Sequence, residues 1–415
     1  MGSVDLVMNH ERVQVDQEDG GSKLKELDEM RNNGGGNMRR RKKSKKRSYM
    51  PRFGCFRTEP DGVDTNFDME VIDGFGNRLD GTHLVIMVNG LIGSAQNWKF
   101  AAKQFLRKYP KDVIAHCSEC NSAMLTFDGV DVMGERLAEE VLAVIKRHQG
   151  LQKISFVGHS LGGLVARYAI ARLYVHDVSK DLPQENGQCE NGGSLKEKYE
   201  GKIAGLEPIN FITFATPHLG SRGHKQIPVF CGFYTLEKVA SRSSWFLGRT
   251  GKHLFLTDSD DGKPPLLLQM VRDCEDLKFL SALQSFRRRV AYANVRHDHL
   301  VGWSTSSIRR RNELPKRQQL SRHERYPHIV NVESAKVPFV QVEVPDEAGV
   351  SACKTINIEE EMIRGLTKVS WGRIDVSFSG SKQKYLAHST IQVKTYCINS
   401  DGADVVQHMV DNFLS

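Results

Sequence analysis

Uninterrupted apolar runs of strand length recur along the chain from His83 onward. The run HLVIMVNGL starts at His83 and ends with Asn-Gly-Leu, and the run KISFVG starts at Lys153 and ends in a glycine. An apolar run without alternation is typical of a strand buried on both faces of a parallel sheet. Similar runs predict further strands at 113–117, 209–214, 288–295 and 371–379.

Stretches with helical spacing lie between these runs. They predict helices at 97–109, 128–150, 161–174, 277–286 and 404–414. In the stretch 128–150 the apolar positions near the helical period are Val132, Leu137, Val141, Leu142 and Ile145, and Gly150 is suited to end the helix. Strands that alternate with helices predict an α/β fold, in which a mostly parallel central sheet is flanked by helices.

Four segments do not fit this alternation. Residues 1–60 are polar and charged with few large apolar side chains, so we expect a disordered tail ahead of a single domain at 80–415. The segment 177–205 is rich in polar residues, Gly and Asn and predicts an inserted surface loop. The segment 224–269 is irregular but carries apolar residues, which suggests a lid or substrate pocket, and 309–350 is expected to be mostly loop.

The net charge of +8 comes from one place in the chain. Eight of the nine residues in Arg39–Arg47 are Lys or Arg, and the remainder is close to neutral. A nucleic-acid-binding fold would spread basic residues over a folded face, so we expect no nucleic-acid partner. Three roles stay open for the basic run: a nuclear localisation signal, a contact with an anionic membrane, and a solvated spacer.

The remaining composition bears on location and cofactors. The first residues have no apolar core of a secretory signal and no run reaches the roughly 18–20 residues of a membrane span, so we expect a cytoplasmic protein or one peripheral to a membrane. Eight cysteines without such a signal predict free thiols. Cys117 and Cys120 have CxxC spacing, but Cys189, Cys231 and Cys274 supply no matching pair, so no metal site is expected.

The candidate nucleophile is Ser160, in the sequence Gly158-His159-Ser160-Leu161-Gly162. This G-x-S-x-G pattern follows a predicted strand and opens a predicted helix, as the nucleophile elbow of a hydrolase requires. The glycines allow a sharp turn that exposes the hydroxyl at a helix N-terminus, where developing negative charge is stabilised. The alternative is an ordinary strand-to-helix turn that contains a serine.

A serine hydroxyl needs a base and an orienting carboxylate, which follow in the order Ser, Asp/Glu, His in this fold. Asp298 comes directly after the predicted strand 288–295, and His388 follows the strand 371–379. Both positions are loops at the carboxyl edge of the sheet, so we assign Asp298 as the acid and His388 as the base. The alternatives are the acids Asp273, Asp276 and Asp375 and the histidines His297, His299, His328 and His408.

Two backbone amides should stabilise the oxyanion. Leu161, the residue after the nucleophile, supplies one. The other is expected from the loop after the first strand, where we assign Leu91, with Ile92 as the alternative and Gly90 permitting close approach. The alternative interpretation of this Asn-Gly pair is a simple turn.

Five motifs in the same order carry a family resemblance. MVNGLIGSAQNW, FVGHSLGGLVARYAIARLY, FATPHLGS, VAYANVRHDHLVGWSTSSIR and LAHSTIQV resemble the serine esterase family of lipase-like α/β-hydrolases found in eukaryotes, plants included. The resemblance covers roughly residues 80 to 395 and implies an α/β-hydrolase fold with inserted loop or lid segments. It also implies a Ser–Asp–His hydrolase of acyl esters, with lipids as the expected substrates. The departure is Asn89, where many lipases have His before the oxyanion glycine.

The expected reaction is therefore ester hydrolysis through an acyl-enzyme, with Ser160, Asp298 and His388 as the triad and no cofactor. Two other classes stay open: acyl transfer to an alcohol by the same triad, and a hydrolase fold that binds without catalysis.

Overall fold

The computed structural model describes residues 68–69, 81–175, 201–221, 247–259, 262–335 and 354–415. They belong to one compact unit, Asp64–Ser415. The expected basic tail and most of the surface loop expected at 177–205 lie outside the described residues. No helix within the described ranges is both long and apolar enough to cross a bilayer.

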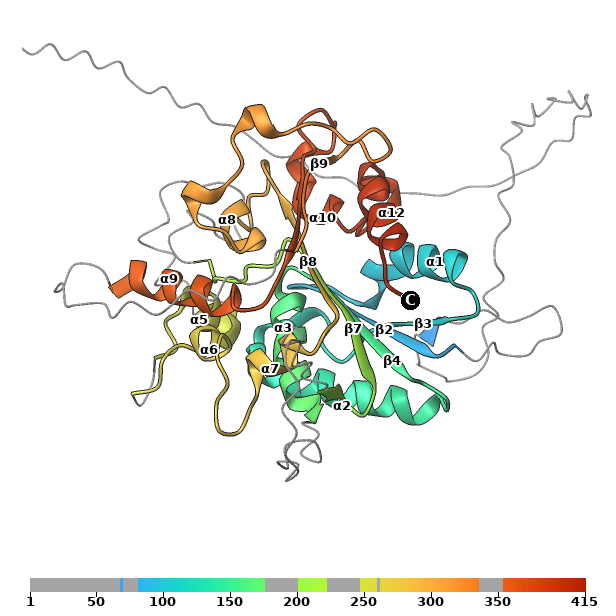
Figure 1. The fold of residues 1–415 in the computed structure, drawn as a ribbon, viewed down its shortest axis with the longest axis vertical. Helices are drawn as coiled ribbons and strands as arrows, with labels where there is room; N and C mark the ends of the chain where they lie inside the picture. The colour runs from blue at the N-terminus through green and yellow to red at the C-terminus, as the bar shows by residue number, and fades with distance from the viewer. Residues whose placement is uncertain (1–67, 70–80, 176–200, 222–246, 260–261, 336–353) are drawn as a thin grey trace, which may run out of the picture. The chain divides into compact units, whose positions relative to one another are not determined.

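The core of the molecule is an eight-stranded sheet in the order β1-β3-β2-β4-β7-β8-β10-β9 (Figure 1). The six inner strands run parallel, while β1 and β9 pair antiparallel at the two edges. The bounds are β1 Asp68–Met69, β2 His83–Val88, β3 Val113–Cys117, β4 Lys153–His159, β7 Glu207–Phe214, β8 Arg288–Asn294, β9 Ile329–Glu333 and β10 Gly372–Val376. All six strands expected from the apolar runs are therefore present.

Helices cover both faces of the sheet, and alternate residues of a strand face opposite layers. Leu84, Ile86 and Val88 of β2 pack with the layer of α2, α3, α7 and α9. Val85 and Met87 pack with the layer of α1 and α12 (Figure 1). The bounds are α1 Lys99–Lys108, α2 Val130–Arg147, α3 Leu161–Leu173, α7 Phe279–Gln284, α9 Lys354–Leu366 and α12 Ala403–Asp411. This strand order, with crossover helices on both faces, is the α/β-hydrolase fold, as expected.

Helix α2 differs in detail from its prediction. It ends at Arg147 with His148 as C-cap, so Gly150, with a φ of 92°, lies beyond the cap. Its inward face consists of Val130, Met133, Gly134, Leu137, Ala138, Val141 and Val144. Leu142, expected among the periodic apolar positions, is instead 44% exposed. The helix therefore carries more apolar residues than it buries.

The segment expected to be loop at 309–350 contains a strand, β9, in its described part. A buried ion pair joins this edge to the sheet: Arg309 Nη1 donates to Asp375 Oδ1 at 2.8 Å, and the two side chains are 3% and 0% exposed. Asn331 of β9 adds a hydrogen bond to the same carboxylate at 2.8 Å. The strand is held by polar contacts that a hydropathy pattern does not reveal.

The described parts of the segment expected as a lid contain helices joined by irregular chain. Helix α5 spans Gly248–Phe255 and α6 spans Leu266–Gln269. Helix α5 is fixed to the start of α2, because Thr250 Oγ1 accepts from the Gly129 amide and His253 Nδ1 accepts from the Val130 amide, both at 3.0 Å. Residues 222–246 lie outside the described ranges, so the lid stays a prediction.

Candidate active site

Ser160 lies at the sharp turn between β4 and α3. Its φ of 53° and ψ of −126° are strained for a residue with a side chain, a conformation that neighbouring packing must enforce. A Cβ on Gly158 would lie 2.6 Å from Gly163 Cα, and one on Gly162 would lie 2.3 Å from the Val88 carbonyl oxygen. Glycine is therefore required on both sides of the serine, which is the steric reason for the G-x-S-x-G pattern.

Asp298 and His388 meet at the same edge of the sheet. The His388 Nδ1–H donates to Asp298 Oδ2 at 3.0 Å. Asn294 Nδ2 donates to the same oxygen at 2.8 Å, while the amides of Leu300 and Val301 donate to Oδ1 at 3.0 and 2.9 Å. Burial by itself raises the pKa of Asp298, but the charge and hydrogen bond of His388, together with the other donors, hold it below its ordinary value. The carboxylate is therefore ionised and fixes the proton of His388 on Nδ1, which leaves Nε2 as a base.

Two of the alternative acids have structural roles elsewhere. Asp273 accepts hydrogen bonds from the amides of Leu280 and Ser281 at the start of α7, at 2.9 and 3.1 Å. Asp375 belongs to the buried ion pair with Arg309. Neither lines the pocket that contains Ser160.

Two alternative histidines are also bound to other partners. His328 Nδ1 lies 2.9 Å from Asp404 Oδ1, and His408 Nδ1 lies 2.8 Å from the Tyr292 hydroxyl. His297 and His299 stand beside the ring of Tyr385, with ring centroids 5.9 and 6.5 Å away. Of these candidates, only His388 lines the pocket with Ser160.

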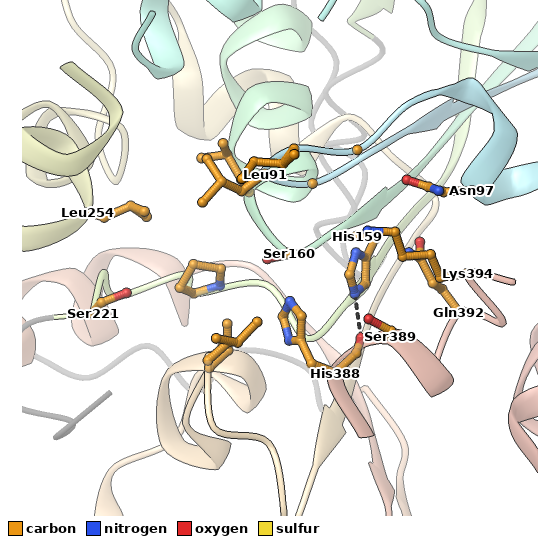
Figure 2. Close-up of a pocket in the computed structure, with 17 residues that line it drawn as sticks. Leu91, Asn97, His159, Ser160, Ser221, Leu254, His388, Ser389, Gln392 and Lys394 are labelled. Atoms are coloured by element: carbon orange, nitrogen blue, oxygen red, sulfur yellow. Dashed lines mark hydrogen bonds between the residues drawn. The ribbon is translucent and has the colours of Figure 1, made fainter. Parts of the chain in front are cut away.

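His159 is a residue of the site that the sequence did not single out. Its Nε2–H donates to the backbone carbonyl of His388 at 2.7 Å, and the two rings lie 4.7 Å apart (Figure 2). Burial, and then the nearby His388, holds the pKa of His159 well below its ordinary value, so the ring is neutral. A buried ring next to Ser160 thus holds the backbone that carries His388. Sequence offers no signal for this, because the acceptor is a carbonyl 229 residues away.

The loop after β2 lies against the elbow. A Cβ on Gly90 would lie 2.9 Å from Ser160 Cβ, so only glycine permits this approach. The Ile92 amide donates to Thr126 Oγ1 at 3.0 Å and is thereby occupied, whereas no described residue accepts from the Leu91 amide. Leu161 is the first residue of α3 and has no carbonyl four residues earlier in the helix to bind. These two amides remain the candidates for the oxyanion hole.

Asn89 stands where many lipases have a histidine. Its Nδ2 donates to the Asn121 carbonyl at 2.9 Å and to the Gly90 carbonyl at 3.1 Å, and the side chain is 4% exposed. The amide therefore ties the loop to the segment after β3.

A cavity of about 130 Å³ opens over Ser160. Figure 2 shows His388 below the serine, Leu91 above it and His159 beside it. The apolar lining residues are Leu91, Ile92, Leu161, Pro217, Leu254, Leu300 and Val301. Polar lining residues that the sequence did not point to are Asn97, Ser221, Ser389, Gln392 and Lys394. The serine thus faces a small space lined by both apolar and polar side chains.

The cysteines form no site in the described part of the chain. Cys117, Cys120, Cys274 and Cys397 form no disulfide, and burial raises the pKa of the Cys120 thiol. No group of three or more His, Cys, Asp or Glu side chains among the described residues is arranged to hold a metal ion.

Comparison with known proteins identifies the family. Residues 78–308 match the family described as "Putative serine esterase (DUF676)". The chain is 30% identical over 233 residues to "Putative lipase ROG1" of Saccharomyces cerevisiae, a match covering 54% of this chain and 28% of that protein. It is 26% identical over 237 residues to "Putative lipase C4A8.10" of Schizosaccharomyces pombe, covering 55% of this chain and 26% of that protein. The chain therefore spans less than a third of the length of either relative.

Solved structures with a similar fold have lower identity. The lipase BlEst2 of Bacillus licheniformis in its propeptide form is 14% identical with a TM-score of 0.30, and the match covers 51% of this chain and 35% of that one. Phospholipase PlaB of Legionella pneumophila is 16% identical with a TM-score of 0.31, over 52% of this chain and 39% of that one. At these scores the fold rests on the strand order described above, and the family rests on the match over 78–308. The chain belongs to this serine esterase family of lipase-like α/β-hydrolases.

Proposed function

We propose that this chain hydrolyses carboxylic esters through an acyl-enzyme on Ser160, with His388 as general base and Asp298 as the orienting acid. One observation carries the proposal. The strained serine and His388 line the same pocket, while the other nitrogen of that imidazole is bound to an ionised, buried carboxylate. Membership of the serine esterase family supports the same reaction class.

The proposed chemistry proceeds in two steps. The His388 Nε2 takes the proton of Ser160 as its Oγ attacks the ester carbonyl, and the oxyanion that forms is held by the amides of Leu91 and Leu161. The imidazolium then gives its proton to the departing alkoxide, which leaves as the alcohol. In the second step His388 activates a water, the acyl–Oγ bond breaks, and the free acid is released with Ser160 restored.

The lining of the pocket supports a lipid acyl chain as the group next to the scissile bond. Leu254, Leu300 and Val301 lie around the serine with the two leucines of the oxyanion loop and elbow. An apolar wall favours burial of methylene groups by about 0.8 kcal/mol each. The cavity is too small for a whole lipid, so the remainder of the substrate extends outward.

A fluorophosphonate probe tests the nucleophile directly. The wild-type chain should be labelled and should cleave p-nitrophenyl esters, and Ser160→Ala should lose both properties. Ser389→Ala is the matched control, because Ser389 lines the same pocket without a proposed role in the reaction. Labelling that survives in Ser160→Ala, or that disappears in Ser389→Ala, overturns the assignment of Ser160. If the acyl group leaves only when an alcohol acceptor is added, the reaction is acyl transfer instead of hydrolysis.

A further inference from the structure

Exposed apolar side chains cluster on the segments that border the pocket. Ten large apolar residues are exposed in the described part of the chain, and three of them, Leu142, Val332 and Leu414, lie on α2, on β9 and after α12. The other seven are Ile92, Met124, Leu125, Tyr385, Leu386, Tyr396 and Ile398. We call these seven residues the apolar rim.

Contacts tie the first part of the rim to the pocket. Ile92 is 55% exposed and itself lines the pocket. Met124 and Leu125 are 73% and 44% exposed on the 3-10 helix η2, Ala123–Phe127. Two hydrogen bonds join η2 to the loop of Ile92, one from the Ile92 amide to Thr126 Oγ1 and one from the Ala123 amide to the Gly93 carbonyl, both at 3.0 Å.

The second part of the rim flanks the segment of His388. Tyr385 and Leu386 end the 3-10 helix η8, Lys384–Leu386, and α10, Ala387–Thr390, follows at once. Tyr396 and Ile398 lie on α11, Tyr396–Asn399. This helix begins two residues after Lys394, which lines the pocket (Figure 2). The Tyr396 ring stacks on Phe100 of α1 at 5.1 Å, next to the 3-10 helix that follows the Ile92 loop. This contact places Tyr396 of the second part beside the helix that follows the Ile92 loop of the first part.

The charge on these segments has one sign. The segments 90–99, 122–127 and 382–398 contain the lysines at 99, 382, 384 and 394 and no Asp or Glu. Lys384 Nζ lies 5.1 Å from the centre of the Tyr385 ring, which places an ammonium group beside an exposed aromatic side chain. In tyrosine and lysine side chains at a membrane surface, the apolar atoms contact acyl chains while the polar ends lie among the lipid headgroups. Lysine is depleted at protein–protein interfaces, so this combination favours a lipid surface over a protein partner.

We propose that the apolar rim and its lysines dock the mouth of the pocket onto an anionic lipid bilayer. This proposal rests on the proposed function, since it supplies the route by which an acyl ester enters the pocket. The docked side chains enter the headgroup region, and the lysines bind anionic headgroups there. The site is distinct from the basic run Arg39–Arg47, which belongs to another part of the chain.

Vesicle sedimentation of the full chain tests the rim. All variants carry Ser160→Ala, so that binding is measured without turnover. The rim variant is Met124→Asp with Ile398→Asp, and the matched control is Leu142→Asp with Val332→Asp, which alters two exposed apolar residues of the remaining three. Each pair is also made with the eight basic residues of 39–47 replaced by serine, so that the tail cannot mask the rim. The probes are vesicles of phosphatidylcholine alone and of phosphatidylcholine with phosphatidylserine.

The rim variant should bind the anionic vesicles at least about tenfold more weakly than the control. Each apolar side chain that no longer inserts into the bilayer removes more binding free energy than a tenfold change in affinity represents. With Ser160 intact, the same substitutions should leave cleavage of soluble p-nitrophenyl butyrate unchanged. Equal binding by rim and control variants overturns the proposal, as does equal binding to both vesicle types. Loss of self-association in the rim variant without vesicle binding assigns the surface to a second copy of the chain and also overturns it. Because binding is measured without turnover, failure of esterase activity would refute the proposed function alone.

Discussion

Asp298→Asn tests how the carboxylate controls His388. The donors that point at Asp298 include Asn294 Nδ2, His388 Nδ1 and the amides of Leu300 and Val301. A carboxylate satisfies all four because it only accepts, whereas an asparagine has one acceptor oxygen and an NH₂ group. With the oxygen turned to the two amides, the NH₂ group faces Asn294 and His388. The imidazole then accepts at Nδ1 and moves its own proton to Nε2.

A proton on Nε2 removes the base that Ser160 needs. In Ser–His–Asp enzymes the wrong tautomer lowers kcat by about 10⁴, equivalent to about 5 kcal/mol of activation free energy. Asp298 is 8% exposed and the substitution keeps its volume, so the fold should survive. We therefore expect kcat to fall by about 10⁴ with little change in KM.

The assay is steady-state hydrolysis of a p-nitrophenyl ester, with the melting temperature as the check on folding. Asp273→Asn is the matched control, because Asp273 was one of the alternative acids for the triad. It is exposed, and its Oδ1 accepts hydrogen bonds from two amides at the start of α7. It should keep wild-type kcat. A folded Asp298→Asn enzyme that retains kcat within about tenfold of wild type would refute the assignment of the acid.

Three further outcomes follow from the same contacts. His159→Phe leaves the His388 carbonyl without its donor, so kcat should fall by about tenfold at unchanged KM, and an effect confined to KM would contradict the positioning role. Gly162→Ala places a Cβ 2.3 Å from the Val88 carbonyl oxygen and should lower the free energy of unfolding by about 1–3 kcal/mol in urea titrations, more than Gly372→Ala, where the nearest atom is 3.6 Å away. Burial, and then Lys153, lowers the pKa of His83 from 6.5 to about 3, so the folded state resists protonation and its stability falls as pH drops below 6.5. Between about pH 7.5 and 4.5, the free energy of unfolding should fall by about 2–3 kcal/mol more in wild type than in His83→Gln. Equal decreases in the two proteins would refute this source of acid sensitivity.

The sheet could be predicted from sequence because its inner strands are buried on both faces. Strands such as β2 and β4 are continuous apolar runs, and a glycine turn or helical stretch marks where each ends. Strand β9 could not be found this way, because it lies at the edge of the sheet and its Val332 is 49% exposed. Beside its backbone pairing with β10, Asn331 and the nearby Arg309 bind Asp375, a network that forms only after distant segments meet.

The candidate site was predictable where chemistry demands a residue type. The spacing of glycines around Ser160 reflects contacts with the Val88 carbonyl and with Gly163, and both the acid and the base follow strands of the sheet. Contacts made by backbone atoms could not be predicted from the sequence, because they do not depend on the residue type. His159 was invisible as a positioning residue for this reason, and the pocket residue Gln392 comes from a turn that sequence pattern does not place.

The distance along the chain between nucleophile and base has a consequence for biosynthesis. The hydrogen bond from His159 to His388 joins residues 229 positions apart, and the segment of His388 leads to α12, which is fastened to α1 by Lys108 and Tyr109. A nascent chain that has completed β4 and α3 holds Ser160 at the elbow but not His388, its proposed base. On the proposed mechanism, Ser160 therefore gains its base only when the segment 387–411 folds back on the first helix. If Ser160 and His388 act as proposed, the growing polypeptide should not react with esters before its last segment has folded.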